Sequence, residues 1–140
     1  MKTKIFLNLA VKDLNHSVTF FNELGFSTNP KFTNDKGACI VISDDIFVML
    51  LVKEFYQTFT EKQICDSTTT SEVLISLSTE SRAKVDEIIE KAVKAGGTDY
   101  QEAKDYGWMY QRTFLDLDGH HWEVFFMDES QIPSEMPTEM

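Results

Sequence analysis

Cysteine is scarce in this chain, and its scarcity excludes two classes of small protein. Only Cys39 and Cys65 occur among 140 residues, and they do not form a Cys-x-x-Cys motif. A disulfide framework or a zinc knuckle needs more thiols at closer spacing. A reducing cytoplasm is therefore the expected location.

Long apolar runs and positive net charge are also missing. No run of about 18 apolar residues is available to span a bilayer. Residues 1–8 lack the apolar core and the cleavage site of a secretory signal. Acidic residues outnumber basic ones by 23 to 13, which gives a net charge of −10. Nucleic acids and anionic membranes would repel such a chain, so neither is an expected partner.

Aromatic residues, in contrast, are plentiful. The chain has 11 Phe, 4 Tyr and 2 Trp, and 42% of its residues are apolar. Such bulky rings suit both sheet surfaces and ligand pockets. The length fits one compact domain, or two small modules that share a sheet.

The first half of the chain predicts one strand, one helix and then three strands. Apolar residues alternate along residues 5–11, as in a strand with one buried face. Asp13 is the expected N-cap of the next helix, and Gly25 is suited to end it. Polar turns then separate three predicted strands, at residues 26–32, 38–42 and 46–52.

The same order recurs in the second half. A strand is predicted at residues 73–77, followed by a helix that Thr79 or Ser81 caps and Gly96-Gly97 ends. A weak strand near residues 99–102 and a hairpin complete the unit.

Because one such unit cannot cover its own sheet face, the repeat predicts two modules with a shared core. Module one covers about residues 1–53, a Thr-rich linker about 54–71, and module two about 72–128. Residues 129–140 are predicted to be a flexible acidic tail, with docking on a partner subunit as the alternative.

The hairpin, residues 113–126, draws attention to Glu123. Asp118-Gly119 supplies the turn, and Glu123 lies between Trp122 and Val124 in the second strand. An ionised side chain there is costly to bury without a partner. Either its side of the sheet faces water, or the carboxylate faces a cavity that admits a metal or a substrate.

These features together resemble the vicinal oxygen chelate superfamily, which groups glyoxalase I, fosfomycin and bleomycin resistance proteins and extradiol dioxygenases. The resemblance extends from Ile5 to Met127. Its motifs are Leu9-Ala10-Val11-Lys12-Asp13-Leu14, Phe20-Phe21 through Leu24-Gly25-Phe26, Ala95-Gly96-Gly97, and Asp116-Leu117-Asp118-Gly119 followed by Glu123-Val124, similar to the family's D-P-D-G-x-x-x-E ending. The resemblance implies an α+β fold of two βαβββ modules that form a U-shaped mixed sheet around a cavity, commonly in a homodimer.

The resemblance also implies a divalent-metal site of four side chains. Glu123 matches the last ligand, but the matching position in module one is Met49, and Phe6 replaces the first-strand histidine. The fourth position falls on Glu72 or Leu74, depending on the strand register. A thioether and a phenyl ring do not suit a hard divalent ion. No cofactor is therefore expected, and the alternative is a metal held loosely by Glu72 and Glu123.

The favoured function is a metal-free, resistance-protein-like binder of a small planar or cationic molecule, held by stacking and charge pairing. The residues expected to line its cavity are Phe6, Asn8, Phe47, Met49, Leu74, Glu123 and Phe125.

Two alternatives remain open. One is a metal-dependent glyoxalase I-like lyase or isomerase, or a dioxygenase, with Glu123 as general base. The other is a non-catalytic dimeric interaction module. The aromatic segment 106–110, which includes Trp108, could belong to that interface. It could equally rim the cavity as a lid, with Arg112 nearby as an anion contact.

Overall fold

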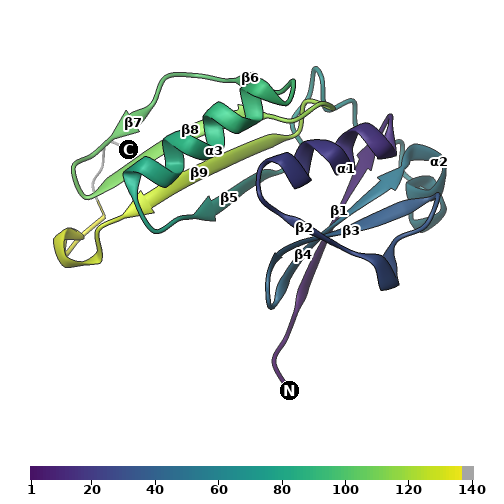
Figure 1. Cartoon of the computed structure of the whole chain (residues 1–140), viewed down its shortest axis with the longest axis horizontal. Helices are drawn as coiled ribbons and strands as arrows, with labels where there is room; N and C mark the ends of the chain where they lie inside the picture. Colours follow the sequence, from purple (N-terminus) through teal and green to yellow (C-terminus); the bar gives the residue numbers. More distant parts are fainter. Residues whose placement is uncertain (137–140) are drawn as a thin grey trace.

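The protein consists of two successive βαβββ modules, the second with one strand divided into two short ones (Figure 1), which confirms the α+β fold that the resemblance implied. This computed structural model describes residues 1–136. The elements of the first module are β1 (Ile5–Val11), α1 (Leu14–Glu23), β2 (Ser27–Asn29), the 3-10 turn η1 (Pro30–Phe32), β3 (Gly37–Ser43) and β4 (Ile46–Val52).

The linker and the second module follow. The linker begins with α2 (Lys53–Tyr56) and the 3-10 turn η2 (Gln57–Phe59). The elements of the second module are β5 (Leu74–Ser78), α3 (Arg82–Lys94), β6 (Thr98–Asp99), β7 (Lys104–Asp105), β8 (Met109–Leu115) and β9 (His121–Met127), and the 3-10 turn η3 (Glu129–Gln131) comes after them. None of the helices in residues 1–136 has the length and apolar character needed to cross a membrane.

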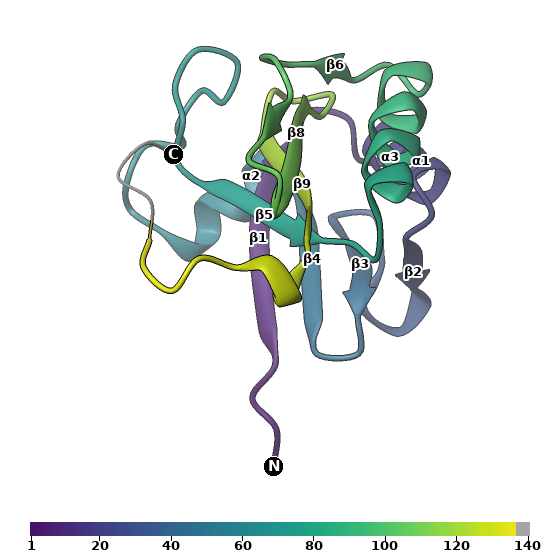
Figure 2. The same cartoon turned by 90° about the vertical axis from the view of Figure 1, so that its left-hand side faces the viewer.

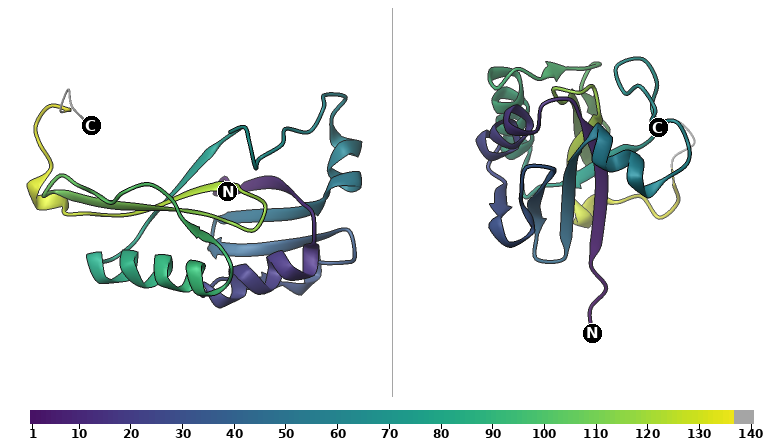
Figure 3. Two further views of the ribbon diagram at one scale, coloured as in Figure 1. Left: turned by 90° about the horizontal axis from the view of Figure 1, so that it is seen from above. Right: turned by 90° about the vertical axis from the view of Figure 1, so that its right-hand side faces the viewer.

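Each module forms its own sheet, and the two sheets have equivalent topology. The strand order is β1-β4-β3-β2 in one and β5-β9-β8-β6 in the other, where β7 also pairs with β8. In both sheets the first strand of the module pairs in parallel with the last one. Helices α1 and α3 lie on one side of the sheets and the linker on the other (Figures 2 and 3).

Local sequence determines where the two long helices start and stop. The Asp13 side chain accepts a hydrogen bond from His16 N, and Ser81 caps α3 by accepting one from Lys84 N. Past α1 the chain turns at Gly25, whose φ of +107° is one that L side chains rarely adopt. Single residues therefore set the start of both helices and the end of α1.

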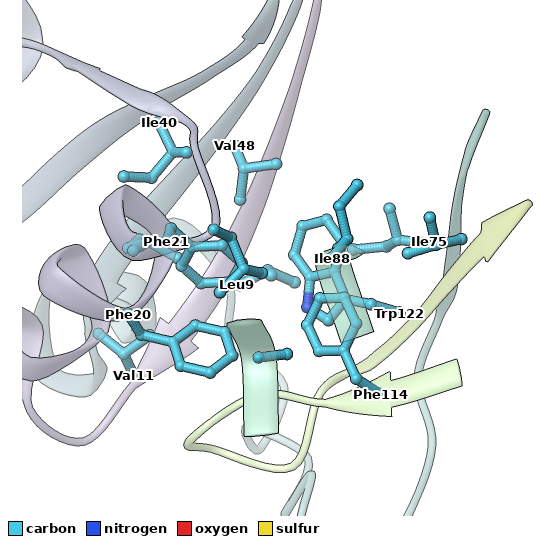
Figure 4. Close-up of a cluster of buried hydrophobic side chains, with 14 of the residues drawn as sticks. Leu9, Val11, Phe20, Phe21, Ile40, Val48, Ile75, Ile88, Phe114 and Trp122 are labelled. Atoms are coloured by element: carbon cyan, nitrogen blue, oxygen red, sulfur yellow. The ribbon is translucent and has the colours of Figure 1, made fainter. Parts of the chain in front are cut away.

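The buried core crosses the boundary between the modules. Phe21 of α1 lies 5.2 Å from the Trp122 ring of β9, and Phe20 lies 6.0 Å from Phe114 of β8, measured between ring centroids. Phe114 and Trp122 are themselves stacked, with an interplanar angle of 2°. Figure 4 shows these rings meeting at the centre of the cluster. The two modules are therefore held together by shared aromatic packing.

The turn of the β8–β9 hairpin adds a polar connection to the first module. The Asp118 carboxylate accepts hydrogen bonds from Lys12 N at 2.7 Å and from Ser17 Oγ at 3.1 Å. His120 Nε2 lies 2.8 Å from the carbonyl oxygen of Ala10. The Asp118 and His120 side chains of this turn thus help to hold module two against the end of β1 and the start of α1.

Two predicted strands differ from the observed ones. The strand expected at residues 26–32 covers only Ser27–Asn29, because Pro30 lacks an N–H and Asn29 caps the following 3-10 turn. The weak strand expected at residues 99–102 is replaced by β6 and β7, with Gln101 at a φ of +66° between them. Of the predicted tail, residues 137–140 lie outside the described part of the chain.

An ion pair at the start of α3 leads to a pH prediction. Both Asp105 carboxylate oxygens accept hydrogen bonds from the Arg82 guanidinium, at 2.8 and 2.9 Å. These bonds, with one from Gly107 N, lower the pKa of Asp105 from 3.8 to about 2. Because the folded-state pKa lies below the unfolded value, the stabilisation is present above pH 4 or so and is lost as the pH falls toward 2.

We expect Arg82→Gln to raise the pKa of Asp105 toward its ordinary value, because the first and largest cause of the shift is removed. A carboxyl-carbon NMR titration measures this directly. Lys104→Gln, which removes a neighbouring charge outside the pair, is the control and should leave the titration close to that of the parent. Equal titrations for parent and Arg82→Gln would contradict the assignment.

Candidate functional site

The candidate site lies on the open faces, the sheet surfaces turned away from α1 and α3. In the first module this face carries Phe6 and Asn8 on β1, opposite Phe47 and Met49 on β4. The Phe6 and Phe47 rings stack with centroids 4.7 Å apart and planes 14° from parallel. Phe6 nevertheless remains 46% exposed. The first module thus presents an aromatic and sulfur-containing surface.

The open face of the second module carries Glu123. Ser76 Oγ on β5 donates a hydrogen bond to Glu123 Oε1 at 2.6 Å, and Gln111 Nε2 on β8 donates one to Oε2 at 3.0 Å. The Glu123 side chain is 19% exposed. Phe125 follows on the same side of β9, since side chains of a strand alternate between its faces. The carboxylate is therefore held by two neutral donors beside an aromatic ring.

His121 also lies on this face, two residues before Glu123. Its Nε2 atom is 3.8 Å from Glu123 Oε2 and is buried without a hydrogen-bond partner among the described residues. The Tyr100 ring packs edge-on against the imidazole, with centroids 5.7 Å apart. His121, Ser76 and Gln111 were not among the site residues predicted from sequence. Ser76 and Gln111 become apparent only once the partners of β9 are known, whereas alternation along β9 already puts His121 on the same face as Glu123.

The register of β5 determines which residue matches each family ligand position. Ser76 pairs with Glu123, as Asn8 pairs with Met49 in the first module. Leu74, two residues earlier, thus matches Phe6. Glu72 precedes β5 by two residues and lines cavities beside the linker.

The side chains at the four family positions do not fit a divalent metal. Phe6, Met49 and Leu74 offer no oxygen or nitrogen ligand, and only Glu123 does. Residues 1–136 contain no group of three or more His, Cys, Asp and Glu side chains that could hold an ion. The Glu123 carboxylate instead accepts hydrogen bonds from Ser76 and Gln111.

Arg112 and Trp108 are not brought to Glu123. Arg112 pairs with Val124 in the β8–β9 register, so its side chain lies on the helix side of the sheet. Its guanidinium donates to Asp86 at 2.9 Å and to Asp99 at 2.8 Å. These carboxylates already neutralise the charge that was expected to contact an anion.

Trp108 immediately precedes β8, with its ring 6.4 Å from that of Tyr106. Its carbonyl oxygen accepts a hydrogen bond from Asp128 N at 2.7 Å. Tyr110, from the same predicted lid segment, lies within β8 and donates its hydroxyl to Asp86 at 2.7 Å. This bond, ahead of the one from Arg112, lowers the pKa of Asp86.

Two paired βαβββ modules that share one buried core define the class of small α+β proteins to which this chain belongs. The family model for the glyoxalase/bleomycin resistance protein/dioxygenase superfamily matches residues 5–124. The chain belongs to this superfamily, as its sequence motifs predicted. Among curated proteins, none matches it significantly.

Solved structures agree with this placement. A hypothetical protein from S. aureus is 32% identical, with a TM-score of 0.77 over 90% of this chain and 95% of that one. A glyoxalase-related enzyme from Fulvimarina pelagi is 19% identical, with a TM-score of 0.76 over 90% and 88% of the two chains. A glyoxalase/bleomycin resistance protein/dioxygenase family enzyme from Burkholderia phytofirmans PsJN is 16% identical, with a TM-score of 0.73 over 87% and 96%. The last two likenesses show the fold alone.

Proposed function

We propose that the protein binds a small planar or cationic molecule on its open faces, without a metal ion, and acts in the cytoplasm as a homodimer. The observation that carries the proposal is the Glu123 carboxylate, fixed by Ser76 and Gln111 in a largely buried position on an aromatic-bearing face. A preorganised carboxylate pairs with a ligand cation, and neighbouring rings such as Phe125 supply stacking. Free thiols at Cys39 and Cys65 are in keeping with a reducing compartment.

The homodimer is supported by apolar side chains on the two edge strands. Phe6 on β1 and Leu74 on β5 are exposed on the open faces, Phe6 to 46% and Leu74 to 55%. Each of these strands pairs with only one neighbour in its sheet. A second chain laid across the open faces would cover these side chains and enclose the ligand between aromatic and acidic surfaces. A sedimentation mass of one chain would exclude this part of the proposal.

The test of ligand binding is Glu123→Gln, which removes the charge but keeps the shape. We expect calorimetry with a planar aromatic cation such as proflavine to show at least tenfold weaker binding, since a hydrogen bond to a charged group is worth about 1.5–3 kcal/mol. Glu90→Gln, on the exposed surface of α3, is the matched control and should bind as the parent does. Equal affinity for all three proteins, or no binding by the parent, would count against the site.

A second candidate function is an enzyme of the glyoxalase type. The observation in its favour is His121 Nε2, 3.8 Å from Glu123 Oε2, because such a pair can share a proton during acid–base catalysis. The discriminating experiment is metal content after purification, followed by assay of the methylglyoxal–glutathione adduct with and without added Ni²⁺, Zn²⁺ or Mn²⁺. Turnover that Glu123→Gln abolishes would place the enzyme ahead of the binding protein.

A further inference from the structure

A second candidate site lies under the linker, away from Glu123. A cavity of about 460 Å³ separates the linker from the open face of the first module; its lining residues include Asn8, Leu51, Tyr56, Phe59, Ile64 and Glu72. A smaller cavity of about 60 Å³ shares several of these residues, Asn8, Tyr56, Ile64, Cys65 and Glu72. We call the two together the linker cavity. Its volume is in the range of small-molecule sites.

The linker is held in place mainly by its own polar contacts. Gln57 Nε2 donates to the carbonyl oxygens of Thr60 and Lys62, at 3.0 and 2.8 Å. Thr68 Oγ1 donates to the Asp66 carboxylate at 2.6 Å. Phe59, in contrast, is 69% exposed. A long connection that is ordered yet leaves a large ring exposed is typical of a binding loop.

The polar lining of the linker cavity has two sides: Asn8, Tyr56 and Glu72 offer acceptors, whereas Lys62 and Gln63 of the linker offer donors. Glu72 makes no ion pair and accepts no side-chain hydrogen bond within residues 1–136. Asn8 uses its amide Nδ2 to donate to the Phe6 carbonyl at 3.3 Å, which leaves its carbonyl oxygen available. The Tyr56 hydroxyl can also accept. Lys62 forms no ion pair with Glu72 within the described residues, so an ammonium group, with three donors and no acceptor, complements the three acceptors.

We propose that the linker cavity binds a small primary amine with an apolar body. The ammonium group pairs with Glu72 and donates to Asn8 Oδ1 and the Tyr56 hydroxyl. The apolar body packs against the apolar part of the wall, which Leu51, Phe59 and Ile64 form. The net charge of −10 raises the local concentration of such cations. This site does not include Glu123, although Asn8 belongs both to it and to the open face of the first module.

Benzylamine and its neutral analogue benzyl alcohol test the proposal by calorimetry on the full chain. We expect benzylamine to bind, and both the alcohol and the Glu72→Gln variant to show at least tenfold weaker binding. Glu61→Gln, an exposed carboxylate of the same linker, is the matched control and should bind benzylamine as the parent does. Glu123→Gln should also be unaffected, which separates this site from the proposed function. Equal effects of Glu72→Gln and Glu61→Gln, or no saturable binding of benzylamine, would overturn it.

Cys65 provides a second readout inside the cavity. Cys65 is partly exposed, whereas Cys39 is fully buried and burial raises the pKa of its thiol. Iodoacetamide should therefore label Cys65 before Cys39. The Cys65→Ser variant should lose this early labelling. Benzylamine should slow that labelling several-fold in the parent and not in Glu72→Gln, provided circular dichroism shows that the variant is folded. Labelling at an unchanged rate in the presence of benzylamine would contradict the placement.

Discussion

Trp122→Ala should lower the free energy of unfolding by about 4 kcal/mol, a value typical of alanine substitutions of large aromatic residues in protein cores. Trp122 is fully buried, stacks on Phe114 and contacts Phe21 from the other module. Its removal leaves a cavity at the point where the modules meet. Urea denaturation followed by circular dichroism measures the loss.

The indole N–H adds a second contribution. Trp122 Nε1 donates to Asp116 Oδ2 at 3.0 Å, while Asp118 N and His120 N donate to Oδ1. Burial raises the pKa of Asp116, and the bond from Trp122 is one of the contacts that oppose the rise. The variant should thus raise the pKa of Asp116 further.

The sign of this effect can be checked with pH. Because the hydrogen bond from Trp122 favours the ionised form of Asp116, the destabilisation by Trp122→Ala should be larger above the Asp116 pKa than below it.

Trp108→Ala is the matched control. It removes the same side chain from a partly exposed position before β8, so a smaller loss, about 1–2 kcal/mol, is expected. Similar losses for the two variants would mean that the aromatic contact between the modules does not carry the stability assigned to it.

The elements of the fold were predictable because their causes are local. Asp13, Ser81 and Gly25 mark helix ends through the chemistry of single residues. The apolar run of residues 46–52 after Asp44-Asp45 predicts a strand, and the β4 observed there has the same bounds. The strand expected at residues 26–32 is shorter in the structure because Pro30, which lacks an N–H, begins a 3-10 turn.

The arrangement of the site was less predictable because it depends on pairing between distant strands. A period of two is unchanged by a shift of two residues, so the pattern alone could not choose between Glu72 and Leu74. Alternation along β9 correctly put Glu123 on the side away from Trp122. The side of the sheet on which Arg112 lies follows from its pairing with Val124, which the sequence alone does not give.

The linker cavity could not be predicted from the sequence, because it too depends on segments that are distant along the chain. Its walls come from residues 51–72 and from Asn8 on β1, which meet only in the folded chain. A polar, Thr-rich sequence shows no period that would predict what it covers. Such sites are found from the structure.

Gly119→Ala should lower the free energy of unfolding by about 2–4 kcal/mol, the sum of backbone strain and a collision with backbone atoms. Gly119 has a φ of +83°, and a Cβ built there would lie 2.6 Å from the carbonyl oxygen of Ser67. The neighbouring carbonyl of Asp118 accepts a hydrogen bond from Ser67 Oγ at 2.7 Å. The hairpin turn and the linker therefore cannot separate without breaking this contact.

Gly107→Ala separates the two causes, because Gly107 has nearly the same φ, +81°, with nothing within 4 Å of an added Cβ. It should cost about 1 kcal/mol, the strain alone. The difference between the two variants in urea denaturation then measures the collision with Ser67. Since relief of that collision requires the linker to move, Gly119→Ala should also speed iodoacetamide labelling of Cys65, whereas Gly107→Ala should not. Equal stability losses for the two variants would mean that the linker yields freely at Ser67 and is not held against the hairpin.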